Sequence, residues 1–238
     1  MGKKTRLYEL HKEAGAKMGN FAGWEMPISY DSQIEEHLQV RKRAGVFDVS
    51  HMTIIEIFGR ASQSLLSKLL ANDITRLRTP GKALYSAMLD FSGHVLDDLI
   101  VYYLARDNYL LVVNCANREK DLAWFQQHIG DGDCTLNERQ DLSILAIQGP
   151  DSLTKASGVL AAPYRRTLEK LVNFQGLWCG EWFIARTGYT GEKGLEIMLP
   201  PEAAIELWKK LGWYNEGQFE EKLPALETSI PPSTTYKS

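Results

Sequence analysis

Short β-prone runs and helical segments follow one another along most of the chain. Runs rich in apolar, β-branched and aromatic residues predict strands over 53–58, 84–90, 97–104, 109–113, 141–150, 182–186 and 195–199. Helical spacing of apolar residues predicts helices over 6–15, 32–44, 62–70, 118–128, 152–160 and 201–211. Because strands come in hairpins with helices between them, the pattern favours an α+β fold of antiparallel sheets flanked by helices over a parallel doubly wound sheet.

Local signals mark where several of these elements begin and end. Ser32 followed by Glu35 forms a capping box that opens the helix over 32–44, and Gly45 stands where a helix C-terminal glycine is expected. Ser92-Gly93-His94 predicts a hairpin turn. Residues 20–30 are apolar but interrupted by glycine and proline, which predicts an irregular loop packed against the protein.

Composition is that of an ordinary globular protein. The 238 residues are 44% hydrophobic and 24% charged, which allows one large domain or two modest ones. The net charge is −3, and no Lys/Arg stripe favours a nucleic acid, so we expect no nucleic-acid partner. No run approaches the ~18 apolar residues of a membrane span, so we expect no membrane association.

The cysteines and the two chain ends complete this general picture. Cys115, Cys134 and Cys179 are an odd number without C-x-x-C spacing, which argues against a disulfide framework and a zinc site and favours a reducing, cytoplasmic location. No apolar segment follows Met1-Gly2-Lys3-Lys4, so a secretory signal is not expected. Residues 212–238 are polar and rich in Pro, Ser and Thr, which predicts a disordered tail.

A pair of acids opens the most β-like run of the chain. Asp97 and Asp98 precede Leu99-Ile100-Val101 on the second strand of the hairpin. Two like charges at one place repel each other and are costly to dehydrate, so a rigid strand that holds both is a way to build a general base or an amine-binding site. The alternative is a solvated strand end that carries two surface acids, and the pair alone does not decide between them.

A glycine-rich turn is the second candidate. Residues 188–196 contain Gly188, Gly191 and Gly194 but lack the GxxxxGK[ST] spacing of a phosphate loop. Glu196 on the return strand could accept two parallel N–H donors from a flat heterocycle, and Tyr189 could stack on such a ring. A tight hairpin with a surface glutamate explains the same residues.

Other candidates for chemistry are weaker. His51 could titrate near neutrality, but a histidine in this setting is more often packed and structural. The chain has no second histidine at ligand spacing and no G-x-S-x-G elbow, so neither a metal nor covalent catalysis is supported. Met52 and Tyr85, judged alone, are more typical of a core than of a pocket.

Eight short segments, taken in order, match a known family. They are Thr5–Tyr8, Phe21–Trp24, Phe47–Met52, Ala71–Asp73, Leu96–Val101, Arg118–Asp121, Ala146–Pro150 and Arg186–Glu192. From about Thr5 to about Lys210 the chain resembles the aminomethyltransferase, or T-protein, family of the glycine cleavage system. The resemblance implies an enzyme of glycine catabolism that uses tetrahydrofolate as co-substrate and no metal, with the lipoylated H-protein as partner.

The resemblance also implies roles for particular residues. Folate N5 attacks the methylene of the aminomethyl group on the lipoyl arm, and ammonia leaves. The catalytic acid of the family matches Asp98, which also contacts the folate, and the glutamate that holds the pterin matches Glu196. Met52, Tyr85 and Tyr189 match positions that line the folate pocket.

The resemblance further predicts a domain organisation. Residues 1–52 and 141–211 would form a discontinuous first α+β domain, and 53–140 a second. The family continues beyond Lys210 with an arginine of the folate pocket and a C-terminal β-barrel domain, and we expect this chain to be C-terminally truncated, to lack both and to have little or no activity. A folate-binding, non-enzymatic protein of the iron–sulfur maturation type is the alternative; its Lys-Gly-Cys-Tyr stretch is not found here. A sarcosine-type dehydrogenase would need a G-x-G-x-x-G flavin fingerprint, which is also missing.

Overall fold

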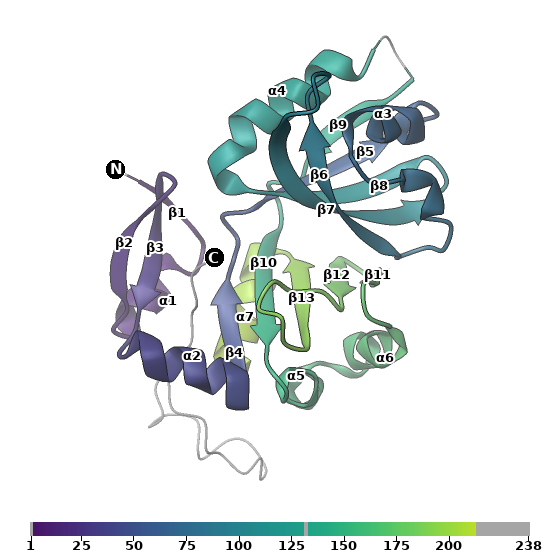
Figure 1. The fold of residues 1–238 in the computed structure, drawn as a ribbon. Helices are drawn as coiled ribbons and strands as arrows, with labels where there is room; N and C mark the ends of the chain where they lie inside the picture. Colours follow the sequence, from purple (N-terminus) through teal and green to yellow (C-terminus); the bar gives the residue numbers. More distant parts are fainter. Residues whose placement is uncertain (1, 131–132, 213–238) are drawn as a thin grey trace. The chain divides into compact units, whose positions relative to one another are not determined.

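The computed structural model of the chain describes residues 2–130 and 133–212 and shows two compact units (Figure 1). The first unit contains the described residues of Met1–His51, Ser143–Leu171 and those from Trp178 onward, and the second contains Met52–Leu142 with Val172–Leu177. The predicted disordered tail, apart from Gly212, lies outside the described residues.

The first unit begins with a small three-stranded sheet in the order β1-β3-β2. It comprises β1 (Lys3–Lys4), β2 (Lys17–Phe21) and β3 (Trp24–Ser29). The irregular loop predicted for 20–30 is therefore wrong, because β2 and β3 form an antiparallel hairpin that turns at Ala22 and Gly23, both with positive φ. Lys17 pairs with Ser29 and Met18 with Pro27, so Pro27 lies beside a bulge, where a strand tolerates proline.

The main sheet of the first unit joins distant parts of the chain in the order β11-β12-β13-β10-β4. Its strands are β4 (Gly45–Asp48), β10 (Ser143–Gln148), β11 (Gly176–Cys179), β12 (Trp182–Ala185) and β13 (Gly194–Leu199). Of β11, Trp178 and Cys179 belong to this unit. β10 pairs with β13 on one side and with β4 on the other, and every one of its side chains is buried. In this sheet β4, which ends just before His51, and β13, which carries Glu196, lie on the two sides of β10.

Five helices accompany these sheets. They are α1 (Tyr8–Glu13), α2 (Gln33–Lys42), α5 (Ser152–Val159), α6 (Ala162–Lys170) and α7 (Pro201–Lys210). The Ser32 cap is confirmed, since its hydroxyl oxygen accepts the Glu35 amide at 3.4 Å. The expectation for Gly45 is wrong: α2 ends at Lys42, and Gly45 pairs with Gln148 as the first residue of β4.

The second unit is one five-stranded antiparallel sheet in the order β6-β7-β8-β5-β9. Its strands are β5 (Thr53–Phe58), β6 (Ala83–Leu89), β7 (Val95–Ala105), β8 (Asn108–Val113) and β9 (Thr135–Glu138). Two helices, α3 (Ser62–Leu69) and α4 (Arg118–His128), and two 3-10 turns, η1 (Ile74–Arg76) and η2 (Cys115–Asn117), complete it. The α+β class with antiparallel sheets and flanking helices, predicted from the sequence, is confirmed.

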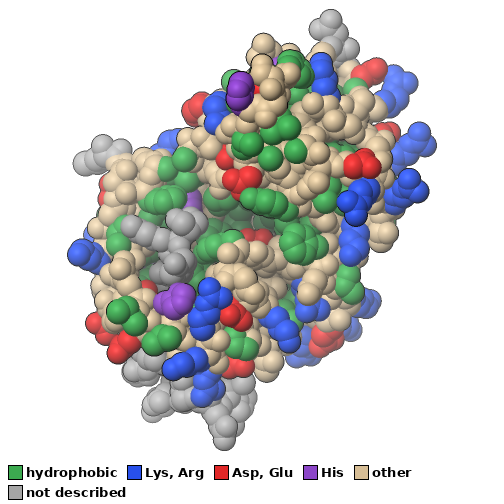
Figure 2. Space-filling view, viewed as in Figure 1, with side chains coloured by type: hydrophobic (Ala, Val, Ile, Leu, Met, Phe, Trp, Pro, Cys, Tyr) green, Lys and Arg blue, Asp and Glu red, His purple; other side chains and the backbone are tan. Residues whose placement is uncertain are grey.

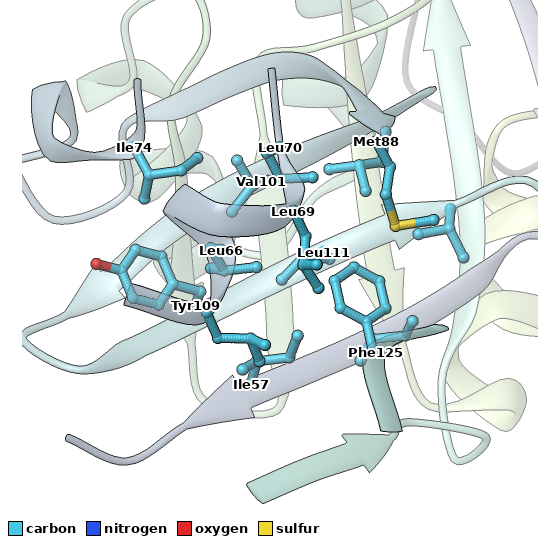
Figure 3. Close-up of a cluster of buried hydrophobic side chains, with 14 of the residues drawn as sticks. Ile57, Leu66, Leu69, Leu70, Ile74, Met88, Val101, Tyr109, Leu111 and Phe125 are labelled. Atoms are coloured by element: carbon cyan, nitrogen blue, oxygen red, sulfur yellow. The ribbon is translucent and has the colours of Figure 1, made fainter. Parts of the chain in front are cut away.

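Apolar residues from both helices and the sheet form the core of the second unit. Figure 3 shows Leu66 and Leu69 of α3 and Phe125 of α4 gathered with Leu111 and Met88 of the sheet, and all five side chains are completely buried. At ~25 cal/mol per Å² of buried apolar surface, side chains of this size contribute about 2 kcal/mol each. This core holds the hairpin that carries the acid pair against α4.

The surface of the described chain has a mixed character. On the face shown in Figure 2, charged side chains of both signs are interspersed with hydrophobic ones. Within residues 2–130 and 133–212, no helix is long and apolar enough to cross a membrane. The same described residues contain no group of three or more His, Cys, Asp and Glu side chains placed to hold a metal ion.

Candidate functional site

The two acids of the pair point to opposite faces of β7. Asp97 is 6% exposed, as part of the buried series that continues with Leu99 and Val101, whereas Asp98 between them is exposed. Strand geometry causes this difference, because successive side chains alternate between the faces of a sheet. One acid is therefore part of the interior and the other is presented to solvent.

Asp98 is held by hydrogen bonds from two neighbouring strands. The Tyr85 hydroxyl of β6 donates to Asp98 Oδ2 at 2.6 Å. Asn114, just after β8, donates through Nδ2 to the Asp98 backbone oxygen at 3.1 Å and, over a longer 3.4 Å, to Oδ1. The bond to Asp98 raises the pKa of Tyr85, which stays a protonated donor. The carboxylate is thus accessible but fixed in direction.

Asp97, on the buried face of β7, has its own hydrogen-bond donors. Asn114 Nδ2 and Asn117 Nδ2 donate to Asp97 Oδ1 at 2.9 and 2.8 Å. Burial opposes the ionised form of Asp97, but hydrogen bonds from Asp121, Asn114 and Asn117 outweigh burial and hold its pKa below the ordinary range. Asp97 is therefore an interior anion that orients the amide of Asn114.

In the first unit, Glu196 belongs to a row of side chains that crosses the main sheet. Phe47 of β4, Ala146 of β10, Glu196 of β13 and Ala185 of β12 are directly paired across neighbouring strands. Paired residues in adjacent strands point to the same face of a sheet. The Tyr189 ring packs edge-on against Phe47, with ring centroids 5.7 Å apart, so Tyr189 and Glu196 lie over the same face.

The Glu196 carboxylate is half-buried and has one fixed donor. The Thr187 hydroxyl donates to its Oε2. Burial raises the pKa of Glu196, and the bond from Thr187 only partly opposes this shift. A ligand that presents N–H donors would stabilise the ionised form, which burial disfavours.

The glycine-rich turn is built around the side chain of Gln148. This residue is fully buried at the end of β10, and its Nε2 donates to the Thr187 backbone oxygen at 3.2 Å while its Oε1 accepts the Thr190 hydroxyl at 2.9 Å. A Cβ at Gly188 would lie 2.0 Å from Gln148 Oε1, and one at Gly194 would lie 2.2 Å from Nε2. Glycine is required at both positions because the glutamine amide fills the space beside them.

His51 and Met52 lie where the chain passes from the first unit to the second. His51 is 5% exposed and packs edge-on against Phe21, with ring centroids 5.4 Å apart. Burial lowers the pKa of His51 despite the nearby Asp48, so its ring is neutral at pH 7. Neither ring nitrogen finds a hydrogen-bond partner among the described residues. Met52 is half-buried and directly precedes β5.

Four of the five predicted site residues therefore form two pairs, one in each unit. Tyr85 and Asp98 are hydrogen-bonded in the second unit, and Tyr189 and Glu196 share a sheet face in the first. Met52 is the first residue of the second unit.

Sequence reasoning missed four residues that support these pairs: Asn114, Asn117, Asp121 and Gln148. One signal was present for Asp121, which stands one helical turn before the buried Phe125 and so places a carboxyl on the apolar side of α4. The roles of the three amides could not be seen, because each depends on a strand or turn distant in sequence.

Comparison with known proteins identifies the fold. The structure of the glycine cleavage system aminomethyltransferase T from Bartonella henselae matches with a TM-score of 0.81 and 38% identity, over 89% of this chain and 57% of that one. The arrangement of antiparallel sheets and helices described above is thus that of a glycine cleavage T-protein.

Sequence comparison supports the same assignment. The family model described as the GCVT N-terminal domain matches residues 7–223, and the chain belongs to this family, as the sequence motifs predicted. An aminomethyltransferase from Pseudomonas syringae pv. tomato is 52% identical over 211 residues, which are 89% of this chain and 58% of that protein. The chain thus spans a little over half the length of these relatives, and the family match extends past Lys210, where the resemblance was expected to end.

Proposed function

We propose that this chain carries the folate-binding and aminomethyl-transfer residues of a glycine cleavage aminomethyltransferase. Tetrahydrofolate is the co-substrate, and the aminomethyl group arrives on the lipoyl arm of the H-protein. Folate N5 and N10 each form a bond to the methylene carbon as its bonds to the amine nitrogen and to the lipoyl sulfur break. The two protons from N5 and N10 end on the leaving groups, so ammonia, methylene-tetrahydrofolate and the dihydrolipoyl protein are released. The free cysteines fit a reducing compartment, and we place the reaction in the cytoplasm.

The observation that carries this proposal is the difference in exposure between the adjacent acids Asp97 and Asp98. Asp98 is exposed and fixed by Tyr85 and Asn114, whereas its neighbour Asp97 is buried. An exposed, oriented carboxylate can hold the attacking amine and stabilise the positive charge that develops on it during bond formation. In this proposal Asp98 is the catalytic acid, and Tyr85 keeps one of its oxygens in position.

The second pair supplies the binding contacts. Glu196 accepts N–H donors of the flat pterin ring, which overcomes the burial that disfavours its ionised form. Tyr189, 41% exposed above Phe47, stacks on the ring, and Met52 adds apolar contact. Of these residues, Glu196 and Tyr189 belong to the first unit, whereas Met52 and the catalytic Asp98 belong to the second.

Two measurements on the 238-residue chain test the proposal. Calorimetric titration with tetrahydrofolate should show saturable binding that Glu196→Gln weakens and Glu169→Gln leaves unchanged, since Glu169 is an exposed acid on α6. Ammonia release from aminomethylated H-protein, measured in a single turnover because low activity is expected of this chain, then separates an enzyme from a folate-binding protein of the iron–sulfur maturation type, which would bind folate but release no ammonia. A chain that folds but binds no folate would contradict both readings.

A further inference from the structure

A second carboxyl group lies buried against Asp97. Asp121, in the first turn of α4, is fully buried, and Asp97 is 6% exposed. α4 packs on the sheet through Phe125, one turn after Asp121, so the carboxyl of Asp121 is enclosed between the helix and β7. The two acids come from different elements of the second unit, β7 and α4, and their carboxyl groups lie within hydrogen-bond reach of each other.

Three buried oxygens of Asp97 and Asp121 have no hydrogen-bond donor unless one of the two acids carries a proton. Asn114 and Asn117 both donate to Asp97 Oδ1. No N–H or O–H of another described residue reaches Asp97 Oδ2 or either oxygen of Asp121, and all three oxygens are buried. Two buried carboxylates in contact cannot both be ionised, so a single proton between them supplies the missing donor.

The charges around the pair determine which acid holds the proton. Asp97 receives two amide donors and is the better anion, whereas Asp121 receives none. Burial, followed by the contact with Asp97, raises the pKa of Asp121 to about 8; Asp98 acts in the same direction and the neighbouring Lys120 opposes it. Asp121 is therefore the protonated partner at neutral pH.

The pair is connected to the exposed acid through one side chain. The Asn114 amide that donates to Asp97 Oδ1 at 2.9 Å also donates to Asp98, at its backbone oxygen and at Oδ1. An amide group is planar and rigid, so the position of the Asp97 anion sets the direction in which Asn114 meets Asp98. A change at Asp121 consequently reaches Asp98 without any direct contact between the two.

From this geometry we infer that Asp121 donates a proton in a hydrogen bond to Asp97, and that the pair positions the catalytic acid Asp98 through Asn114. Asp121 and Asp97 are thus positioning residues. The effect of these two residues on catalysis rests on the proposed function, whereas the shared proton and the orientation of Asn114 do not depend on it. When Asp121 loses this proton, it becomes a third negative charge beside Asp97 and Asp98. The hydrogen bond from Asp121 that orients Asp97 is then lost.

The proton itself can be observed without any substrate. The wild-type chain should show an infrared band of a protonated carboxyl group at pH 7 that is missing in Asp121→Asn and present in the control Glu169→Gln. Because folding raises the pKa of Asp121, the folded state holds a proton that the unfolded state has lost, and stability falls as pH rises toward about 8. The unfolding equilibrium constant of the wild type, relative to that of Asp121→Asn, should rise by up to about tenfold per pH unit between pH 6 and 8 and level off above.

The positioning role has its own readout. The Asn114 side-chain amide resonances should titrate with the proton of the pair in the wild type and stay constant in Asp121→Asn, whose amide donates to Asp97 at every pH. For ammonia release at pH 7, Asp121→Asn should remain within about threefold of the wild type, whereas Asp121→Leu, which has no donor, should lose about tenfold, mainly in kcat.

Distinct results would overturn the two parts of the inference. The same carboxyl band in wild type and Asp121→Asn, with parallel stability profiles, would exclude the shared proton. Titration of the acid pair with unchanged Asn114 resonances would exclude the positioning role. If the wild type binds no folate and releases no ammonia, the proposed function fails, while the infrared, stability and resonance measurements still decide whether the pair exists and orients Asn114.

Discussion

The glycine-rich turn gives a prediction whose size follows from the structure. In Gly188→Ala the new methyl group would lie 2.0 Å from Gln148 Oε1, 2.3 Å from Nε2 and 2.4 Å from Cδ. Gln148 is completely buried and cannot move into solvent, so it must give up its bonds to Thr187 and Thr190. Overpacking costs about 1–3 kcal/mol, and two weakened hydrogen bonds add about 1 kcal/mol each, which gives a loss of about 3–5 kcal/mol.

A double-mutant cycle separates this cause from a general effect of the turn. The free energy of unfolding in urea is measured for the wild type, Gly188→Ala, Gln148→Ala and the double variant. Gly188 does not have a positive φ, so alanine should cost less than about 1 kcal/mol once the glutamine amide is removed. An equal cost of Gly188→Ala in both backgrounds would refute the packing of Gln148 against the turn.

Two further predictions concern the proposed pairs. Glu196→Gln should weaken tetrahydrofolate binding by about tenfold at pH 7, a loss of one charge-assisted hydrogen bond. Because burial raises the pKa of Glu196, wild-type affinity should fall as the solution is acidified through that pKa, and the glutamine variant should lose this dependence; calorimetry across pH 4–8 shows either result. Tyr85→Phe removes the 2.6 Å bond to Asp98 and should lower the rate of ammonia release about tenfold while stability changes by less than about 0.5 kcal/mol, since Tyr85 is 55% exposed; an unchanged rate would exclude its positioning role.

Much of the fold could be predicted because it is encoded locally. The β6–β7 hairpin, α4 and the Ser32 cap each carry their own periodicity or turn residues within a short window. The β2–β3 hairpin could not be predicted in this way, because Pro27 and Gly23 weaken the strand pattern of its sequence. Strand β3 is instead defined by its pairing with β1 on one side and with β2 on the other. Strand β9 and helix α6 were missed for a related reason: their sequences are short or polar, and long-range pairing or packing defines them.

The candidate site shows the same division. Alternation along a strand predicts that Asp97 and Asp98 point to opposite faces, but which of the two is buried depends on the position of α4. The partners Asn114 and Asp121 are 16 and 23 residues or more away from the acid pair and are placed by β8 and α4. Local sequence therefore identifies the charged groups, and tertiary packing assigns their protonation and direction.

Replacing the exposed acid of the hairpin tests the central claim most directly. Asp98→Asn keeps the shape of the side chain and its bond to Tyr85 but removes the negative charge that would stabilise the attacking amine. If Asp98 is the catalytic acid, ammonia release from aminomethylated H-protein in a single turnover should fall about a hundredfold or more, a loss of about 2.7 kcal/mol of transition-state stabilisation, with an unchanged urea midpoint. A rate within about threefold of that of the wild type and of the control Glu169→Gln would contradict the claim.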